Sequence, residues 1–179
     1  MEDRILAAFL KRQHDEGMAL AEASDLLDLS LFDPFRLGVR DQYIAHFSCT
    51  GLIKTPEAAV VEANHFTLGI WFPPSYLVRA ESFVVVKWFE PWTVFHPNIR
   101  PPLMCVGRIV PGMPLVDLLY QCFEIITYNK VTMREDDALN REACAWARRN
   151  VERFPIDRRP LKRRALDLHI EPVAGGRPV

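Results

Sequence analysis

The sequence lacks the features that would assign it to several large classes of protein. The formal net charge of its 179 residues is −1, so the chain carries no overall field that would attract nucleic acid. No run of apolar residues approaches the roughly 20 that an α-helix needs to cross a bilayer. We therefore expect no membrane contact, and we do not expect nucleic acid as a partner.

Cysteine is also scarce, and no two cysteines have the C-x-x-C spacing that is typical of a zinc site. The four cysteines are Cys49, Cys105, Cys122 and Cys144. The N-terminus reads MEDRILAAFLKRQHDE, which is charged at both ends and does not resemble a secretory signal. Scattered cysteines in such a chain indicate free thiols, so we predict a cytoplasmic protein with no bound metal.

Hydrophobic periodicity in the first half predicts an α+β protein. Residues 2–27 repeat apolar side chains at partial helical spacing, with Gly17 as a point of interruption. Residues 43–48 and 66–72 alternate in the way that half-buried strands do, and residues 83–89 are almost entirely apolar on both faces. Because these short segments follow one another without intervening helices, they favour an antiparallel meander.

The second half is predicted to contain a long loop and then helices. Residues 91–114 are rich in proline, and from Leu115 apolar side chains recur at i, i+3, i+4, i+7, i+8 and i+11. Asn140 is a good N-cap for a second helix. Basic clusters, prolines and glycines then take over, so we predict a catalytic domain over residues 1–155 and a basic, partly flexible tail over residues 156–179.

Short motifs follow one another in a fixed order. Residues 72–76 read FPPSY after a predicted strand, and residues 96–98 read HPN in the loop. Cys105 lies seven residues after Asn98, and residues 136–140 read DDALN before the last predicted helix. In this order and at these spacings, the motifs resemble those of the ubiquitin-conjugating enzymes: Phe-Pro-x-x-Tyr, His-Pro-Asn with a following active-site cysteine, and Asp-Asp-Pro-Leu-Asn.

The resemblance, which covers residues 1–155, implies a fold and a chemistry. The fold is an N-terminal helix, a four-stranded antiparallel meander, an active-site loop and C-terminal helices. Cys105 would accept a ubiquitin-like protein as a thioester, because a thiolate both attacks and leaves well at neutral pH. Asn98 would either stabilise the oxyanion or hold the loop in place. Asp137 would guide the incoming lysine, although a solvated acid before a helix fits equally well.

The resemblance also implies partners. They are an activating enzyme, the ubiquitin-like protein and a target protein with an acceptor lysine. No cofactor is expected, since the activating enzyme consumes the ATP. The chain looks like the divergent bacterial members that are encoded beside activating enzymes and ubiquitin-like proteins, some of them in antiviral operons.

Two segments depart from the family pattern and keep alternatives open. Residues 77–81 replace a proline-rich stretch, and residues 106–113 lack the family's Trp-Ser-Pro loop. In the family, these loops form much of the surface that a ubiquitin ligase binds. Whether a ligase recognises this chain is therefore open. The alternatives are a catalytically silent adaptor of the same fold and an unrelated cysteine hydrolase. Such a hydrolase would pair Cys105 with His46, His65 or His96, although the resemblance implies that His96 is a structural part of its turn.

Overall fold

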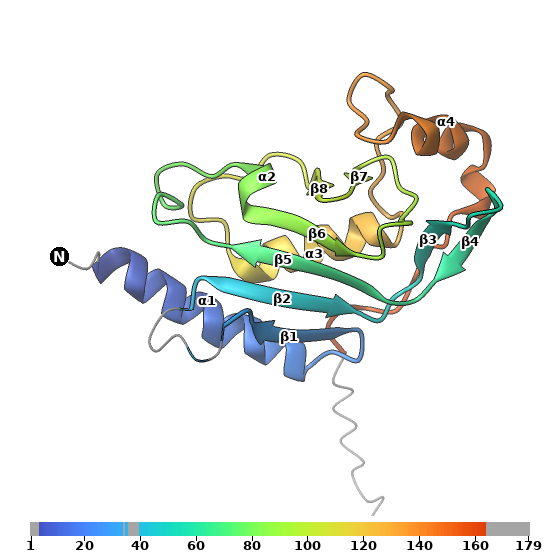
Figure 1. Cartoon of the computed structure of the whole chain (residues 1–179). Helices are drawn as coiled ribbons and strands as arrows, with labels where there is room; N and C mark the ends of the chain where they lie inside the picture. The colour runs from blue at the N-terminus through green and yellow to red at the C-terminus, as the bar shows by residue number, and fades with distance from the viewer. Residues whose placement is uncertain (1–3, 34, 36–39, 164–179) are drawn as a thin grey trace, which may run out of the picture.

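The computed structural model describes residues 4–33, 35 and 40–163, and Figure 1 shows a twisted antiparallel sheet with the first and third helices packed against it. The helices are α1 (Arg4–Glu22), α2 (Ser82–Val85), α3 (Leu115–Ile126) and α4 (Arg141–Arg149), followed by a 3-10 turn η1 (Val151–Arg153). The strands are β1 (Leu27–Leu31), β2 (Gln42–Phe47), β3 (Gly51–Lys54), β4 (Val60–Ala63), β5 (Phe66–Trp71), β6 (Val86–Glu90), β7 (Ile99–Arg100) and β8 (Leu103–Met104). The predicted α+β class and N-terminal helix are confirmed. In the part of the chain that is described, no helix is both long enough and apolar enough to span a membrane.

The sheet is antiparallel, as predicted, but it is larger than a four-stranded meander. Its six strands lie in the order β1-β2-β5-β6-β8-β7. The first four strands of this order are antiparallel neighbours, and the short strands β8 and β7 extend the sheet beyond β6. Strands β3 and β4 follow β2 in the chain and form a separate two-stranded hairpin beyond the end of the main sheet (Figure 1), where Ile53 of β3 also forms an isolated bridge with Val94. The proline-rich loop therefore contains two strands that the sequence pattern did not indicate.

The core contains the side chains that hydrophobic periodicity predicted to be buried. Alternate residues of β2 and β5 are buried on one face of the sheet, because successive side chains of a strand point to opposite faces. They are Tyr43, Ala45, Phe47, Phe66, Leu68 and Ile70. The apolar stripe of α3 covers this face. It consists of Leu115, Leu118, Leu119, Cys122, Phe123 and Ile126, all of which are buried in the same cluster.

The first helix is shorter than predicted and is not interrupted. Helix α1 ends at Glu22, and Leu27 already belongs to β1, where it pairs with Phe47. Gly17 lies within α1, and a Cβ atom at this position would come within 2.6 Å of a Leu115 methyl group. The glycine therefore allows α1 and α3 to approach closely, a tertiary role that helix propensity does not reveal.

The apolar run at residues 83–89 is also divided differently. Residues 82–85 form the helical turn α2, in which the Val85 amide donates to the carbonyl of Glu81 at 2.9 Å, and the strand begins only at Val86. A short run that is apolar on all sides has no periodicity that could separate a buried turn from a buried strand.

The first part of the predicted tail packs on the domain. Leu161 is 1% exposed and belongs to the main core. The backbone amide of Arg163 donates to the carbonyl of Ala23 at 2.8 Å, and Asp157 accepts from the Thr50 amide at 3.2 Å. The remainder of the predicted tail, residues 164–179, lies outside the described residues.

Candidate active site

Cys105 lies directly after the short hairpin of β7 and β8. Its amide donates a hydrogen bond to the carbonyl of Asn98 at 2.8 Å, which continues the antiparallel ladder one pair beyond the hairpin strands. The seven-residue spacing between these two residues therefore has a simple structural basis. The chain leaves at Asn98, turns, and returns beside it at Cys105.

The hairpin has one buried and one open face. Ile99 and Met104 are both 0% exposed and pair with each other across the ladder. Because side chains alternate along a strand, the residues on either side of them face the opposite way. Arg100 pairs with Leu103 on that outer face, and Cys105 follows Leu103 by two residues. The alternation thus places the thiol on the outer face with Arg100 and Leu103.

Cys105 differs from the other three cysteines in its accessibility. It is partly exposed, whereas Cys49, Cys122 and Cys144 are all 0% exposed. Burial raises the pKa of the Cys49 and Cys122 thiols to about 12, and it also raises the pKa of Cys144. Since the thiolate is the reactive form, these three side chains are suited to packing and not to nucleophilic attack. Cys105 is the one thiol that a second protein could reach.

The Asn98 side chain joins three segments of the site. Its amide nitrogen donates to the carbonyl of Cys105 at 3.3 Å, and its oxygen accepts from the amide of Thr132 at 2.9 Å. The side chain is 6% exposed, so these bonds are largely shielded from water. This arrangement favours the loop-holding role of Asn98.

His96 is a structural part of the turn. Its Nδ1 accepts a hydrogen bond from the Asn98 amide at 3.0 Å, and its ring packs edge-on against Tyr128 with centroids 4.3 Å apart. Burial lowers the pKa of His96 to about 3. A neutral imidazole whose basic nitrogen is already occupied is a poor base for Cys105, which supports the interpretation of His96 as structural.

The loop after α3 contributes residues that the sequence did not single out. The Lys130 ammonium donates to the carbonyl of Val106 at 3.3 Å, directly after Cys105. The backbone of Thr132 bonds to Asn98, and its carbonyl lies 3.5 Å from the Cys144 sulfur. The first contact holds the residue that follows Cys105, and the second holds Asn98, which lies beside Cys105. No local sequence pattern indicated them, since they depend on the packing of α3 and α4.

Asp137 lies near the candidate site but is engaged elsewhere. Its carboxylate is exposed and forms an ion pair with Arg134 at 3.3 Å, and Arg134 also binds Asp136 at 2.6 Å. The hydrogen bond from Arg134 lowers the pKa of Asp136. The structure does not bring Asp137 into contact with Cys105 or Asn98, so its predicted role requires that it exchange Arg134 for the incoming amine.

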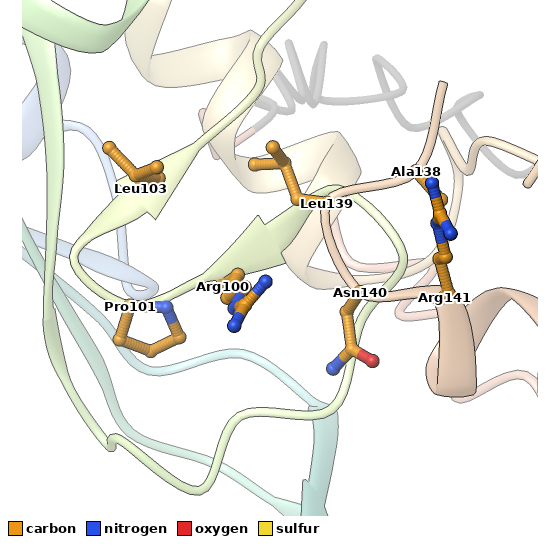
Figure 2. Close-up of a pocket in the computed structure, with 7 residues that line it drawn as sticks. All are labelled: Arg100, Pro101, Leu103, Ala138, Leu139, Asn140 and Arg141. Atoms are coloured by element: carbon orange, nitrogen blue, oxygen red, sulfur yellow. The ribbon is translucent and has the colours of Figure 1, made fainter. Parts of the chain in front are cut away.

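A cleft of about 640 Å³ opens beside the hairpin. As Figure 2 shows, residues of the hairpin form one wall and residues 138–141, which follow Asp137, form the other. Asn140 caps α4 by accepting from the Ala143 amide at 3.0 Å, and its own amide donates to the carbonyl of Pro97 at 3.1 Å. The N-cap predicted at Asn140 is confirmed, and it ties this wall to the active-site loop.

The histidines that a cysteine hydrolase would need are placed differently. His46 lies on the exposed side of β2, where its Nδ1 is 3.0 Å from the hydroxyl of Thr67. His65 lies in the exposed connection between β4 and β5. Within residues 4–33, 35 and 40–163, no histidine forms a hydrogen bond with Cys105, and no group of three or more potential ligands is placed to hold a metal ion.

The two loops that depart from the family pattern approach each other, since a Cβ atom on Gly112 would lie 3.8 Å from the Leu77 side chain. The buried hydroxyl of Tyr76 donates to the carbonyl of Met113 at 2.8 Å. Val78 and Val110, one from each loop, are among the exposed large hydrophobic side chains. Each altered segment therefore exposes a large apolar side chain.

Compared with known proteins, the chain matches no family model and no curated protein.

Proposed function

We propose that this protein is a conjugating enzyme for a ubiquitin-like protein, with Cys105 as the acyl carrier and a ubiquitin-conjugating-enzyme-like fold. The observation that carries the proposal is the environment of Cys105. It is the one accessible thiol among four, it is anchored to Asn98 at the end of a hairpin, and it lies beside an open cleft. The order of N-terminal helix, antiparallel sheet, hairpin and two helices agrees with this proposal.

In the proposed charging step, the Cys105 thiolate attacks the carbonyl carbon of a thioester on the activating enzyme. A new bond forms between that carbon and the Cys105 sulfur, and the activating enzyme's thiolate leaves. Asn98 keeps the Cys105 backbone in place through its bonds to the carbonyl and amide of this residue. Since the attacking and leaving groups are both thiolates, the exchange needs no cofactor on this protein.

In the proposed transfer step, a neutral lysine amine attacks the Cys105 thioester. A carbon–nitrogen bond forms, the Cys105 thiolate leaves, and the extra proton of the nitrogen passes to solvent. Asp137, after release from Arg134, would hold the lysine ammonium before it loses its first proton. The acidic pair at residues 136–137 thus supplies charge near the cleft, while the thiol supplies the chemistry.

A charging assay tests the proposal directly. The purified chain is incubated with ATP, a bacterial activating enzyme and the ubiquitin-like protein that this enzyme activates, and the products are separated on a non-reducing gel. We expect a thiol-sensitive adduct in the wild type and in Cys122→Ala, and none in Cys105→Ala. Non-covalent binding without an adduct would replace the proposal with the silent adaptor. Release of a preformed conjugate without ATP would replace it with the hydrolase.

A further inference from the structure

Two arginines face the cleft from opposite walls without a partner of their own. Arg100 lies on β7, and Arg141 is the first residue of α4 (Figure 2). Both are exposed, and neither has an ion pair with any residue that the structure describes. The acids near Arg141 in sequence are occupied, since Lys54 binds Glu142, Arg134 binds residues 136–137 and Arg148 binds Glu135. The two guanidinium groups are therefore available to an external anion.

The remainder of the cleft is suited to a narrow peptide. Its walls between the arginines are built from apolar side chains that are each partly exposed. They are Pro101, Leu103, Ala138 and Leu139. A volume of about 640 Å³ is within the range of well-formed ligand sites and is too small for a folded domain. Such a cleft fits an extended segment that carries negative charge.

The cleft lies close to the proposed nucleophile, although Cys105 itself does not line it. Leu103 lines it, and Cys105 lies two residues further along the same outer face of the hairpin. Two residues of a strand span roughly 7 Å. A chain bonded to the Cys105 sulfur would therefore reach the space between Arg100 and Arg141 within its last few residues. An acceptor segment has no covalent bond to Cys105 that would keep it in this space.

We infer that the cleft binds the C-terminal tail of the protein carried on Cys105, and that this tail is acidic, with carboxylates about two to five residues before its end. The inference rests on the proposed function of Cys105. Arginine pairs with carboxylates through two parallel hydrogen bonds, which gives both attraction and orientation. The acylated partner is favoured over an acceptor because it stays bonded at the site for the lifetime of the thioester.

Two synthetic peptide thioesters test this charge preference on the isolated protein. The probes are acetyl-Ala-Asp-Leu-Glu-Gly-Gly and acetyl-Ala-Lys-Leu-Lys-Gly-Gly, both as esters of the neutral thiol 2-mercaptoethanol. The Cys105 thiolate attacks the terminal carbonyl and 2-mercaptoethanol leaves, so that acylation is followed by intact mass. We expect the acidic probe to react at least about fivefold faster at low salt, with the difference shrinking in 0.5 M NaCl.

The variants separate the effect of the two arginines in the cleft from the effect of the protein's net charge. In the double variant Arg100→Gln/Arg141→Gln the preference for the acidic probe should disappear, while alkylation of Cys105 by iodoacetamide should proceed at the wild-type rate. The control Arg149→Gln/Arg158→Gln changes the net charge equally at exposed positions that do not line the cleft, and it should keep the preference. Equal rates for both probes, or a preference that persists without Arg100 and Arg141, would overturn the inference.

Further arms separate this inference from the proposed function. If neither probe acylates the protein, the acyl-carrier proposal fails. Binding of fluorescent acetyl-peptide amides to Cys105→Ala then tests whether the cleft binds an acidic peptide. Arginine-dependent binding of the acidic amide supports the acidic-peptide site, and absence of binding overturns it. If acylation shows no preference but a lysine peptide with flanking glutamates discharges Cys105 faster, the cleft belongs to the acceptor and the tail assignment is wrong.

Discussion

Asn98 and Cys105 are joined by two hydrogen bonds, one from the side-chain amide of Asn98 to the carbonyl of Cys105 and one from the Cys105 amide to the carbonyl of Asn98. The second bond involves only backbone atoms and could form with any residue at position 98. The first depends on the asparagine, as does the bond from Thr132 to the same side chain. Asparagine is therefore required here to connect three segments, whatever its part in catalysis.

We expect Asn98→Ala to lower the free energy of unfolding by about 1–3 kcal/mol, because it removes both side-chain bonds and leaves the shielded Thr132 amide without its acceptor. Urea unfolding measures the loss. The matched control is Asn129→Ala, which removes a single bond to the Thr127 hydroxyl and should cost less. Equal losses in the two variants would show that the two side-chain bonds of Asn98 stabilise the fold no more than the single bond of Asn129 does.

The accessibility of the four thiols predicts the order in which they are alkylated. In the native protein at pH 8, iodoacetamide should label Cys105 well before Cys122, whose thiol is buried and has a pKa raised to about 12. Peptide mass spectrometry reads the site of labelling. In urea all four cysteines should react at similar rates, which is the control. Native labelling of Cys122 as fast as that of Cys105 would remove the basis for an exposed nucleophile.

Sequence reasoning predicted the elements that have one buried and one exposed face. The alternation around Tyr43 and Phe66 and the stripe from Leu115 were correct, because a two-sided environment imposes a period on the sequence. The helical turn α2 was not predicted, since a short apolar segment such as residues 83–89 carries no period. The end of α1 was placed too late, at residue 27, where β1 already begins. The close approach at Gly17 likewise follows from a neighbour distant in sequence.

The candidate site was predictable only in its local part. Asn98 and Cys105 belong to one hairpin, so their proximity follows from their spacing. Thr132, 34 residues from Asn98, joins the site only through the packing of α3. Arg100 and Arg141 become opposite walls of one cleft for a similar reason, and no pattern at either position indicates a site.

The buried imidazole of His96 makes stability depend on pH. Its pKa is about 3 in the folded protein and about 6.5 in an unfolded chain. Between these values the unfolded state binds a proton that the folded state does not, so the free energy of unfolding falls as the pH drops below 6.5. From pH 7 to pH 5 this effect amounts to about 2 kcal/mol.

The variant His96→Asn offers an oxygen to the Asn98 amide but does not titrate, so it should lose less stability between pH 7 and pH 5 than the wild type does. Urea unfolding at the two pH values measures this difference. His14, whose pKa burial also lowers, is present in both proteins and cancels in the comparison. The same pH dependence in both proteins would mean that His96 is protonated in the folded state.

The segment that follows the predicted domain should contribute to its stability. Leu161 is buried in the main core, whereas Ile156, from the same segment, is 48% exposed. Removing a buried leucine side chain typically costs about 2–5 kcal/mol. We therefore expect Leu161→Ala to lower the unfolding free energy by an amount in this range, and Ile156→Ala, which removes a similar volume from the surface, to lower it by much less. Denaturation of the two variants side by side measures this difference. Similar small losses in both would mean that residues 156–163 are only loosely attached, and that the domain is complete at residue 155.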